Sequence, residues 1–152
     1  MARQGEFFDR ALFYMGPWYP FDNFSSFMVQ YAGVDWMTSE HAYQASKFLG
    51  HPDVIDLVRT ARSAHDAKKI ARANNQHKRS DWQEVKVLIM KNIVRAKLFQ
   101  HPHIQKKLLE TGAMKIVEDS PTDDFWGRGP DGNGQNHMGK IWMELREELR
   151  AG

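Results

Sequence analysis

The sequence contains no cysteine, so disulfide bonds, thiolate metal ligands and a cysteine nucleophile are all excluded. A long hydrophobic run is also missing, because the longest aliphatic stretch, near Val87 to Met90, is far too short to cross a bilayer. Residues 1–10 lack the apolar segment of a signal peptide. These absences predict a soluble, cytoplasmic protein that makes no contact with a membrane.

A strong charge of either sign is missing as well. The 21 Lys and Arg residues nearly balance the 19 Asp and Glu residues, and the formal net charge is +2. This balance does not by itself identify a nucleic-acid-binding protein. A local basic set either steers polyanions or forms an ordinary solvated helix face, which is the commoner case. The set comprises Lys68, Lys69, Arg72, Lys78 and Arg79.

The length of 152 residues, with 41% hydrophobic and 12% aromatic residues, predicts one globular domain spanning 1–152 with a single core. From Phe7 to Met37 the chain is rich in aromatics and is interrupted by Gly16-Pro17 and Tyr19-Pro20, which favours short strands and turns. Residues 27–37, with Ala32-Gly33 in the middle, have the pattern of a small hairpin.

Capping residues and apolar periodicity predict that most of the remaining chain is helical. The expected helices run over 39–49, 52–62, 63–74, 81–99, 104–111 and 138–149, with a strand over 114–118. Thr38 or Ser39 should cap the first of these helices, and Ser80 or Asp81 the long one. The long helix should form the centre of the core through a stripe of Val85, Leu88, Ile89, Ile93 and Leu98. The expected fold class is α+β, predominantly α-helical, with a small antiparallel β element.

One polar motif falls on the first helix. Glu40, Gln44 and Lys47 are spaced so that a helix stacks a carboxylate, an amide and an ammonium on one face. A first-turn glutamate also complements the helix dipole without any function, and Lys47 can be a solvated ion-pair partner. A lysine buried among aromatic rings has a lowered pKa, and it can then act as an amine nucleophile or stabilise negative charge as an ammonium.

A second motif is the glycine-rich run from Asp123 to Lys140. Long loops in small domains are usually functional. Its glycines lead to Asn136, a good helix N-cap, so the sequence predicts backbone amides that are free to face an anion. Trp126 is harder to bury in such a loop and is a candidate for stacking on a base or ribose, whereas Asp124 is either a turn acid or a second catalytic carboxylate.

Several blocks in this order resemble the NADAR (YbiA-like) family. They are Asp22-Asn23-Phe24, Trp36-x-Thr38-Ser39-Glu40-His41-Ala42-Tyr43-Gln44-Ala45-x-Lys47-Phe48, Arg79-x-Asp81-Trp82, Thr111-Gly112, Glu118, Asp124-x-Trp126-Gly127 and Gly134-x-Asn136-x-x-Gly139-Lys140. The resemblance extends from near Phe13 to near Arg146. Asp22 departs from the serine expected before Asn-Phe, and the loop around Arg128 and Pro130-Asp131 is locally distinctive.

The resemblance implies a hydrolase that cleaves the N-glycosidic bond between a ribose and a base. Two substrate groups are implied: ADP-ribose attached to guanine in DNA or RNA, which we take first, and phosphoribosyl-aminopyrimidine intermediates of riboflavin synthesis. A non-catalytic ADP-ribose-binding module and a basic nucleic-acid-binding module are the alternatives. This chemistry needs no cofactor, and the histidines, of which His101 and His103 are separated by a proline, predict no metal.

The expected catalytic residues are Glu40, Lys47 and Asp124, and the two polar motifs should converge on one phosphorylated sugar. The expected substrate-binding residues are Asn23, His41, Tyr43, Gln44, Trp82, Trp126, Gly127, Arg128, Gly134, Asn136 and Gly139. The sequence makes no prediction of oligomeric state.

Overall fold

The computed structural model describes residues 9–14 and 16–152. The chain divides into two units: the terminal unit comprises segments 1–22 and 102–152, and the central unit comprises segment 23–101. The expectation of one domain over 1–152 stays a prediction. The predominantly helical fold with a small β component is confirmed. Phe7, Phe8 and Met15, which belong to the segment expected to form strands and turns, lie outside the described residues.

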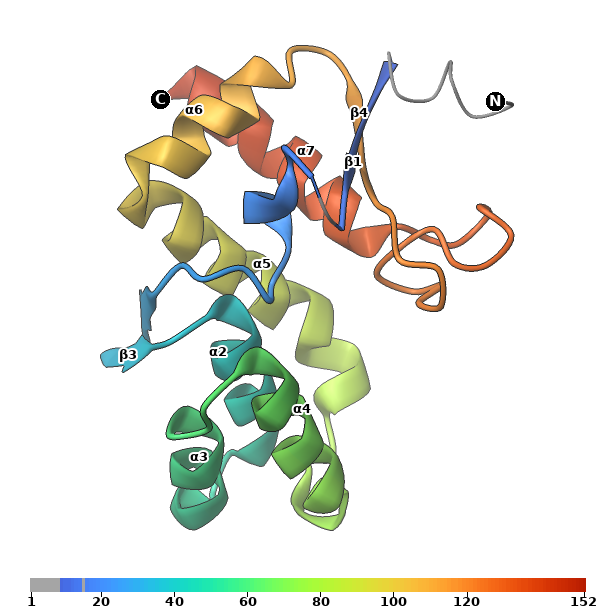
Figure 1. The fold of residues 1–152 in the computed structure, drawn as a ribbon. Helices are drawn as coiled ribbons and strands as arrows, with labels where there is room; N and C mark the ends of the chain where they lie inside the picture. The colour runs from blue at the N-terminus through green and yellow to red at the C-terminus, as the bar shows by residue number, and fades with distance from the viewer. Residues whose placement is uncertain (1–8, 15) are drawn as a thin grey trace. The chain divides into compact units, whose positions relative to one another are not determined.

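The terminal unit contains a short parallel strand pair. Strand β1 (Arg10–Phe13) pairs with β4 (Lys115–Glu118), with Arg10 opposite Lys115. Figure 1 shows these two strands side by side, with helix α7 (His137–Ala151) packed against β4. The sequence predicted the strand at 114–118 and short strands within 7–37, but not the bounds of β1. It did not predict the parallel pairing, because β1 and β4 are far apart in the sequence.

An aromatic core fills the terminal unit. Phe21, at the end of the 3-10 helix η1 (Tyr19–Phe21), lies 4.8 Å from Trp142 of α7 and 6.0 Å from Phe13 of β1 between ring centroids. Trp142 Nε1 donates to the Phe21 carbonyl at 3.0 Å, so the buried indole N–H is satisfied. Helix α6 (Pro102–Glu110) buries Ile104 and Leu108.

The central unit begins with the expected hairpin. Strands β2 (Val29–Tyr31) and β3 (Val34–Trp36) are antiparallel. The two turn residues, Ala32 and Gly33, have φ of +54° and +77°. Two positive φ angles in a row match the twist of a two-residue hairpin.

Helices follow the hairpin in the central unit. They are α2 (Ser39–Ala45), η2 (Ser46–Phe48), α3 (Pro52–Arg59), α4 (Ala64–Ala73), η3 (Asn75–His77) and α5 (Trp82–Gln100). The first helix is shorter than the predicted 39–49, because the chain changes to 3-10 geometry at Ser46, whose hydroxyl donates to the Ala42 carbonyl at 2.7 Å. Helix α4 starts as expected, with the Ser63 hydroxyl accepting the Asp66 amide at 3.0 Å.

Helix α5 buries a different stripe from the predicted one. Of the five expected residues, Ile93 and Leu98 are buried, Val85 and Ile89 are half-buried, and Leu88 is 62% exposed. Trp82, Met90, Val94 and Lys97 complete the buried side. The prediction was wrong for Leu88, since the packing partners, rather than hydrophobicity alone, choose which row of side chains faces inward.

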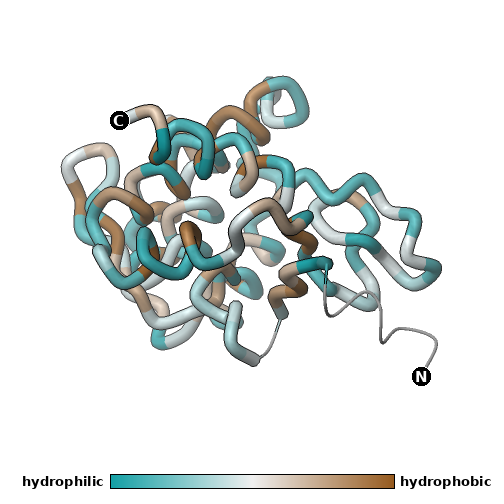
Figure 2. The backbone as a smooth tube through the Cα atoms, turned by 90° about the horizontal axis from the view of Figure 1, so that it is seen from above, coloured by the Kyte–Doolittle hydropathy of each residue, from teal (hydrophilic) through white to brown (hydrophobic). Residues whose placement is uncertain are grey.

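None of the helices in the described part of the chain is long and apolar enough to span a membrane. Hydrophobic and hydrophilic stretches alternate along the backbone in Figure 2, which agrees with helices that each bury one side.

Candidate active site

Buried hydrogen bonds fix the first turn of α2. Thr38, the N-cap residue, accepts the His41 amide on its hydroxyl at 3.2 Å, and this oxygen lies 2.7 Å from His41 Nδ1. The other ring nitrogen, Nε2, lies 3.0 Å from the Ala61 carbonyl. A carbonyl only accepts, so Nε2 carries a proton and donates it to the Ala61 carbonyl. His41 therefore ties α2 to the segment after α3, and its expected substrate contact stays a prediction.

Asn23 holds the start of the same helix. Its carbonyl accepts the Glu40 amide at 3.1 Å and the Ser39 hydroxyl at 3.2 Å, and its side-chain oxygen accepts the same hydroxyl at 3.1 Å. The side-chain Nδ2 lies 3.4 Å from Sδ of Met90 on α5. An amide that has no partner within the helix is thereby satisfied, and the backbone that carries the Glu40 carboxylate is held in place.

Glu40 and Gln44 lie on one side of α2, as the sequence predicts. Nε2 of Gln44 donates to Oε2 of Glu40 at 2.6 Å, and the two residues are only 4% and 6% exposed. Oε1 of Gln44 is buried and has no hydrogen-bond partner among the residues described. Turning the amide over would set Oε1 against the carboxylate, so the donor orientation is the favourable one. A buried acceptor without a partner costs about 1–3 kcal/mol, which a hydroxyl or amine of a bound molecule would offset.

Lys47, in η2, is half-buried beside two aromatic rings. Its Nζ lies 5.6 Å from the Tyr43 ring centroid and 5.8 Å from that of Trp82, and the two rings are 5.1 Å apart. Both aromatic residues are buried. The rings screen the lysine from water on one side, and their faces attract the protonated form.

The pKa of Lys47 is lowered from 10.5 to about 8, chiefly because burial disfavours the ammonium. The Glu40 carboxylate raises this pKa, whereas the Lys78, Lys68 and Lys86 charges lower it further. About a tenth of the Lys47 population is therefore an uncharged amine at pH 7, and about half at pH 8. The combination of a buried carboxylate and an amine of lowered pKa is typical of catalytic sites.

Backbone hydrogen bonds close the glycine-rich loop on itself. The amides of Gly134, Gln135, Asn136, His137 and Met138 donate to the carbonyls of Arg128, Asp124, Gly127, Phe125 and Trp126, respectively, at 2.7 to 3.1 Å. The prediction that these amides are free to face an anion was wrong, because the register within the loop pairs each of them with a carbonyl.

Asn136 and Gly139 are explained by packing against β4, and Gly134 by a close approach to the loop backbone. Asn136 has φ of +53° and its side chain makes no capping hydrogen bond, contrary to expectation. Instead Oδ1 accepts the Glu118 amide and Nδ2 donates to the Ile116 carbonyl, both at 3.0 Å. A Cβ at Gly139 would lie 2.1 Å from the Ile116 carbonyl oxygen, and one at Gly134 would lie 2.5 Å from that of Gly127. Only glycine allows these close approaches.

The charged residues of the loop differ in their surroundings. Oδ1 of Asp123 accepts the amides of Phe125 and Trp126 at 3.0 and 2.8 Å, which is a local turn role. Asp124 is exposed, and its carboxylate makes no hydrogen bond with any residue that the structure describes. Arg128 is 4% exposed and donates from Nε to Oδ1 of Asp119 at 2.6 Å. Asp124 therefore remains the candidate for a second carboxylate.

Trp126 belongs to a half-exposed group of three rings. Its centroid lies 4.9 Å from that of Phe125 and 6.3 Å from that of His137, and the Phe125 and His137 rings lie 4.3 Å apart. Sequence reasoning singled out Trp126 but missed Phe125 and His137. Only the hydrogen-bond register of the loop brings His137 to the two aromatic residues, and composition gives no signal for that register.

The expected site residues thus form two groups, one in each unit. Asn23, Glu40, His41, Tyr43, Gln44, Lys47 and Trp82 belong to the central unit, and Asp124, Trp126, Gly127, Arg128, Gly134, Asn136 and Gly139 belong to the terminal unit. That the two groups share one pocket stays a prediction. Over segments 9–14 and 16–152, no group of three or more His, Asp or Glu side chains is placed to hold a metal ion.

Comparison with known proteins gives matches over most of the chain. Residues 7–150 match the family model described as the NADAR domain. The chain is 40% identical over 145 residues to the N-glycosidase Npun_R5314 of Nostoc punctiforme, covering 92% of this chain and 93% of that protein. It is 37% identical over 129 residues to the N-glycosidase YbiA of Escherichia coli, covering 85% and 80%, respectively.

A solved structure and a longer protein match as well. The NMR structure of the E. coli protein YbiA has a TM-score of 0.85 and 35% sequence identity, covering 93% of this chain and 85% of that one. The riboflavin biosynthesis protein VVA0006 of Vibrio vulnificus is 39% identical over 128 residues, which is 84% of this chain but 35% of that protein.

Proposed function

This chain belongs to the NADAR domain family, and on that premise we propose that it is an N-glycoside hydrolase that cleaves the bond between a ribose carbon and a base nitrogen. The names of two relatives, both N-glycosidases, support this activity. The structural observation that carries the proposal is the series of Glu40, Gln44 and Lys47, in which a buried carboxylate lies near an amine whose pKa is about 8.

Hydrolysis of an N-glycoside breaks the bond between C1 and the base nitrogen. The oxygen of water bonds to C1, and the base nitrogen leaves with a proton. Positive charge develops on the ribose as the bond lengthens, and a nearby carboxylate stabilises that charge. Glu40 takes the proton of the attacking water or of a ribose hydroxyl, while Gln44 orients the carboxylate through its hydrogen bond of 2.6 Å.

Lys47 has two chemically distinct roles available. As a neutral amine, its nitrogen bonds to C1 of the ring-opened sugar, the base leaves with a proton, and water later hydrolyses the lysine imine to regenerate the amine. As an ammonium, Lys47 stabilises negative charge as it develops. Borohydride separates the two roles, because it reduces an imine to a stable amine and leaves the mass of the sugar on Lys47 in a tryptic peptide.

In this proposal the first substrate is ADP-ribose attached to guanine in nucleic acid. Trp126 would stack on the base or ribose, and Asp124 would supply a second carboxylate. The second candidate is a phosphoribosyl-aminopyrimidine, which is favoured by the similarity to a protein named for riboflavin biosynthesis.

The direct test offers both substrates to the purified protein. Release of free ADP-ribose from a modified oligonucleotide supports the first candidate, and release of ribose 5-phosphate from the aminopyrimidine supports the second. Tight binding of ADP-ribose without hydrolysis of either compound would instead identify a non-catalytic binding module.

A further inference from the structure

Three lysines of the central unit lie around Lys47. Lys68 is on α4, Lys78 follows η3, and Lys86 is on α5. Helices α4 and α5 both pack against α2, which leads directly into the 3-10 turn that carries Lys47. The Arg79 amide donates to the Lys47 carbonyl at 2.8 Å, which brings the neighbouring Lys78 to the same turn.

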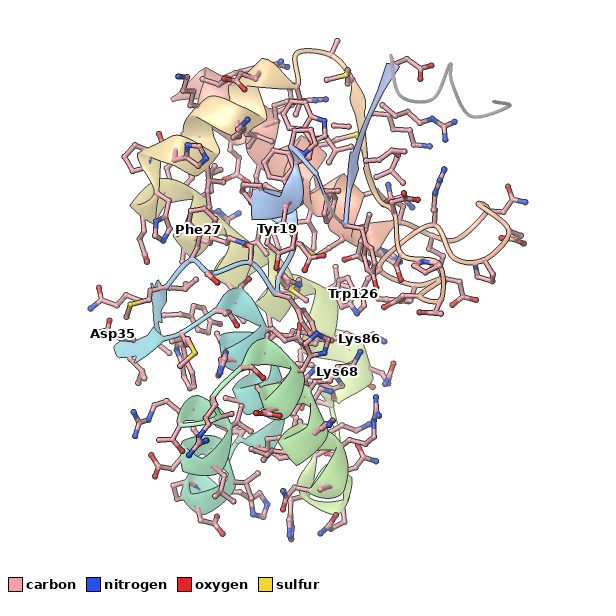
Figure 3. The ribbon with its side chains drawn as sticks, viewed as in Figure 1. Tyr19, Phe27, Asp35, Lys68, Lys86 and Trp126 are labelled. Carbon is pink, nitrogen blue, oxygen red and sulfur yellow. The ribbon has the colours of Figure 1, made fainter. Side chains whose placement is uncertain are left out.

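Lys86 reaches the same place from α5. It lies one helical turn after Trp82, whose ring centroid is 5.8 Å from Lys47 Nζ, so the two residues lie on one side of the helix. Figure 3 labels Lys68 and Lys86, which come from two different helices, α4 and α5. The basic residues are therefore gathered from separate parts of the sequence by the fold.

The electrostatics of Lys47 separates these lysines from the other basic residues nearby. Lys68, Lys78 and Lys86 each lower the pKa of Lys47. Lys69, next to Lys68 on α4, points to a different side of that helix. Coulomb interactions weaken with distance, so the charges that act on Lys47 are close to it. Lys69 is therefore a natural control.

Arg79 is not part of this lysine group, because a carboxylate pairs with its guanidinium. Its Nε and Nη2 donate to the two carboxylate oxygens of Asp81 at 2.6 and 2.9 Å, and this two-point pairing offsets the guanidinium charge. Within the described part of the chain, Glu40 is the negative charge that acts on Lys47, against three positive ones.

We propose that Lys68, Lys78 and Lys86 form a lysine collar that binds the phosphate group carried by the ribose of the substrate. The inference rests on the proposed function, which supplies the ribose. A phosphorylated ribose also carries hydroxyl groups. Oε1 of Gln44, which has no hydrogen-bond partner among the described residues, is an acceptor for one of them. The collar thus recognises the phosphate while α2 recognises and activates the sugar.

Two sources supply this phosphate chemistry: the 5′-phosphate of a phosphoribosyl small molecule and the diphosphate of ADP-ribose. Both probes are titrated by calorimetry into the full chain at low ionic strength, with ribose as the uncharged comparison. Each of the single variants Lys68→Ala, Lys78→Ala and Lys86→Ala should raise the Kd of a phosphate probe about three- to tenfold, because each variant removes one nearby positive charge. If the lysine variants bind both ribose 5-phosphate and ADP-ribose more weakly, the collar binds the 5′-phosphate. If they bind only ADP-ribose more weakly, the collar binds the diphosphate.

The matched control is Lys69→Ala, which should change each Kd less than twofold. Unfolding midpoints of all variants should stay close to that of the unmodified protein, because substitutions of exposed or half-exposed lysines rarely destabilise. The proposal would be overturned by any of three results. They are a Kd raised as much by Lys69→Ala as by the collar variants, unchanged Kd values in the three collar variants, or no binding of either probe by the unmodified protein.

Hydrolysis is measured separately, so the two proposals fail independently. Lysine-dependent phosphate binding in a protein that hydrolyses no N-glycoside supports the collar and contradicts the enzyme. Hydrolysis with unchanged phosphate binding after all three lysines are replaced together supports the enzyme and contradicts the collar.

Discussion

Nε2 of Gln44 donates a hydrogen bond of 2.6 Å to Oε2 of Glu40, and this geometry leaves Oε1 of Gln44 buried without a partner in the segments that the structure describes. A hydrogen bond to a charged acceptor contributes about 1.5–3 kcal/mol, which holds the carboxylate in one orientation. One amide thus orients the proposed acid/base group and offers an acceptor to a ligand.

Glu40→Gln should lower kcat about 100-fold or more, because an amide cannot take a proton from water. The fold should survive, since the side-chain oxygen of the variant still accepts from Gln44. Turnover and the unfolding midpoint are the two measurements, and Glu84→Gln, an exposed first-turn acid of α5, is the control. Full activity in Glu40→Gln would transfer the acid/base role to Asp124.

Gln44→Leu should lower kcat roughly tenfold, because the Glu40 carboxylate loses the bond that orients it. The variant should also lose part of the stabilisation that ribose or ADP-ribose gives in thermal unfolding, since the acceptor Oε1 is gone. Gln83→Leu, at an exposed position of α5, controls for the change in side chain. Identical kinetics in the Gln44→Leu and Gln83→Leu variants would contradict this role.

The pH profile of kcat/KM should show a limb near the Lys47 pKa of about 8. Activity that rises with pH through this limb identifies the neutral amine as the active form, and activity that falls identifies the ammonium. Lys78 lowers this pKa, so Lys78→Ala should move the limb to higher pH while Lys69→Ala leaves it in place. A limb that does not move in Lys78→Ala would show that another group titrates there.

Stability should follow the same titration. The folded-state pKa of Lys47 is about 8, against 10.5 when the group is unperturbed. Between these two pH values the unfolded chain binds more protons than the folded chain, so Lys47 makes the free energy of unfolding rise with pH. Below pH 8 the lysine is protonated in both states, and the full cost of burying its charge destabilises the folded state. Lys47→Met should therefore be more stable than the unmodified protein at pH 7, with a smaller gain at pH 10. Urea unfolding at both pH values measures the difference, and an equal gain at both would contradict the shift.

Gly139→Ala should destabilise the fold by about 1–3 kcal/mol or more, as overpacking does. The added Cβ would meet the Ile116 carbonyl oxygen at 2.1 Å, and backbone cannot move aside as a flexible side chain does. Urea unfolding measures the loss. Gly152→Ala, where the nearest atom is 3.6 Å away, is the matched control. A stable Gly139→Ala variant with weakened substrate binding would favour the substrate contact that the sequence predicts.

Local patterns predicted many of the elements. The hairpin around Ala32-Gly33, the start of α2 after Thr38 and the start of α4 after Ser63 were expected and are present. Each depends on residues within one turn of one another, so the sequence contains the whole interaction. The exposed Leu88 shows where this reasoning ends, because its row on α5 depends on which helices pack there.

The sequence by itself determined the order of the helices and the helical spacing that sets Glu40 beside Gln44, because backbone geometry fixes contacts between residues one turn apart. Only the tertiary structure decided the parallel pairing of β1 with β4, the closure of the glycine loop and the gathering of Lys68, Lys78 and Lys86 around Lys47. The strand pairing and the lysine group depend on segments distant in sequence. The loop closes through hydrogen bonds between residues 6 to 12 positions apart, and their register follows from hydrogen-bond satisfaction within the loop, which no short pattern encodes.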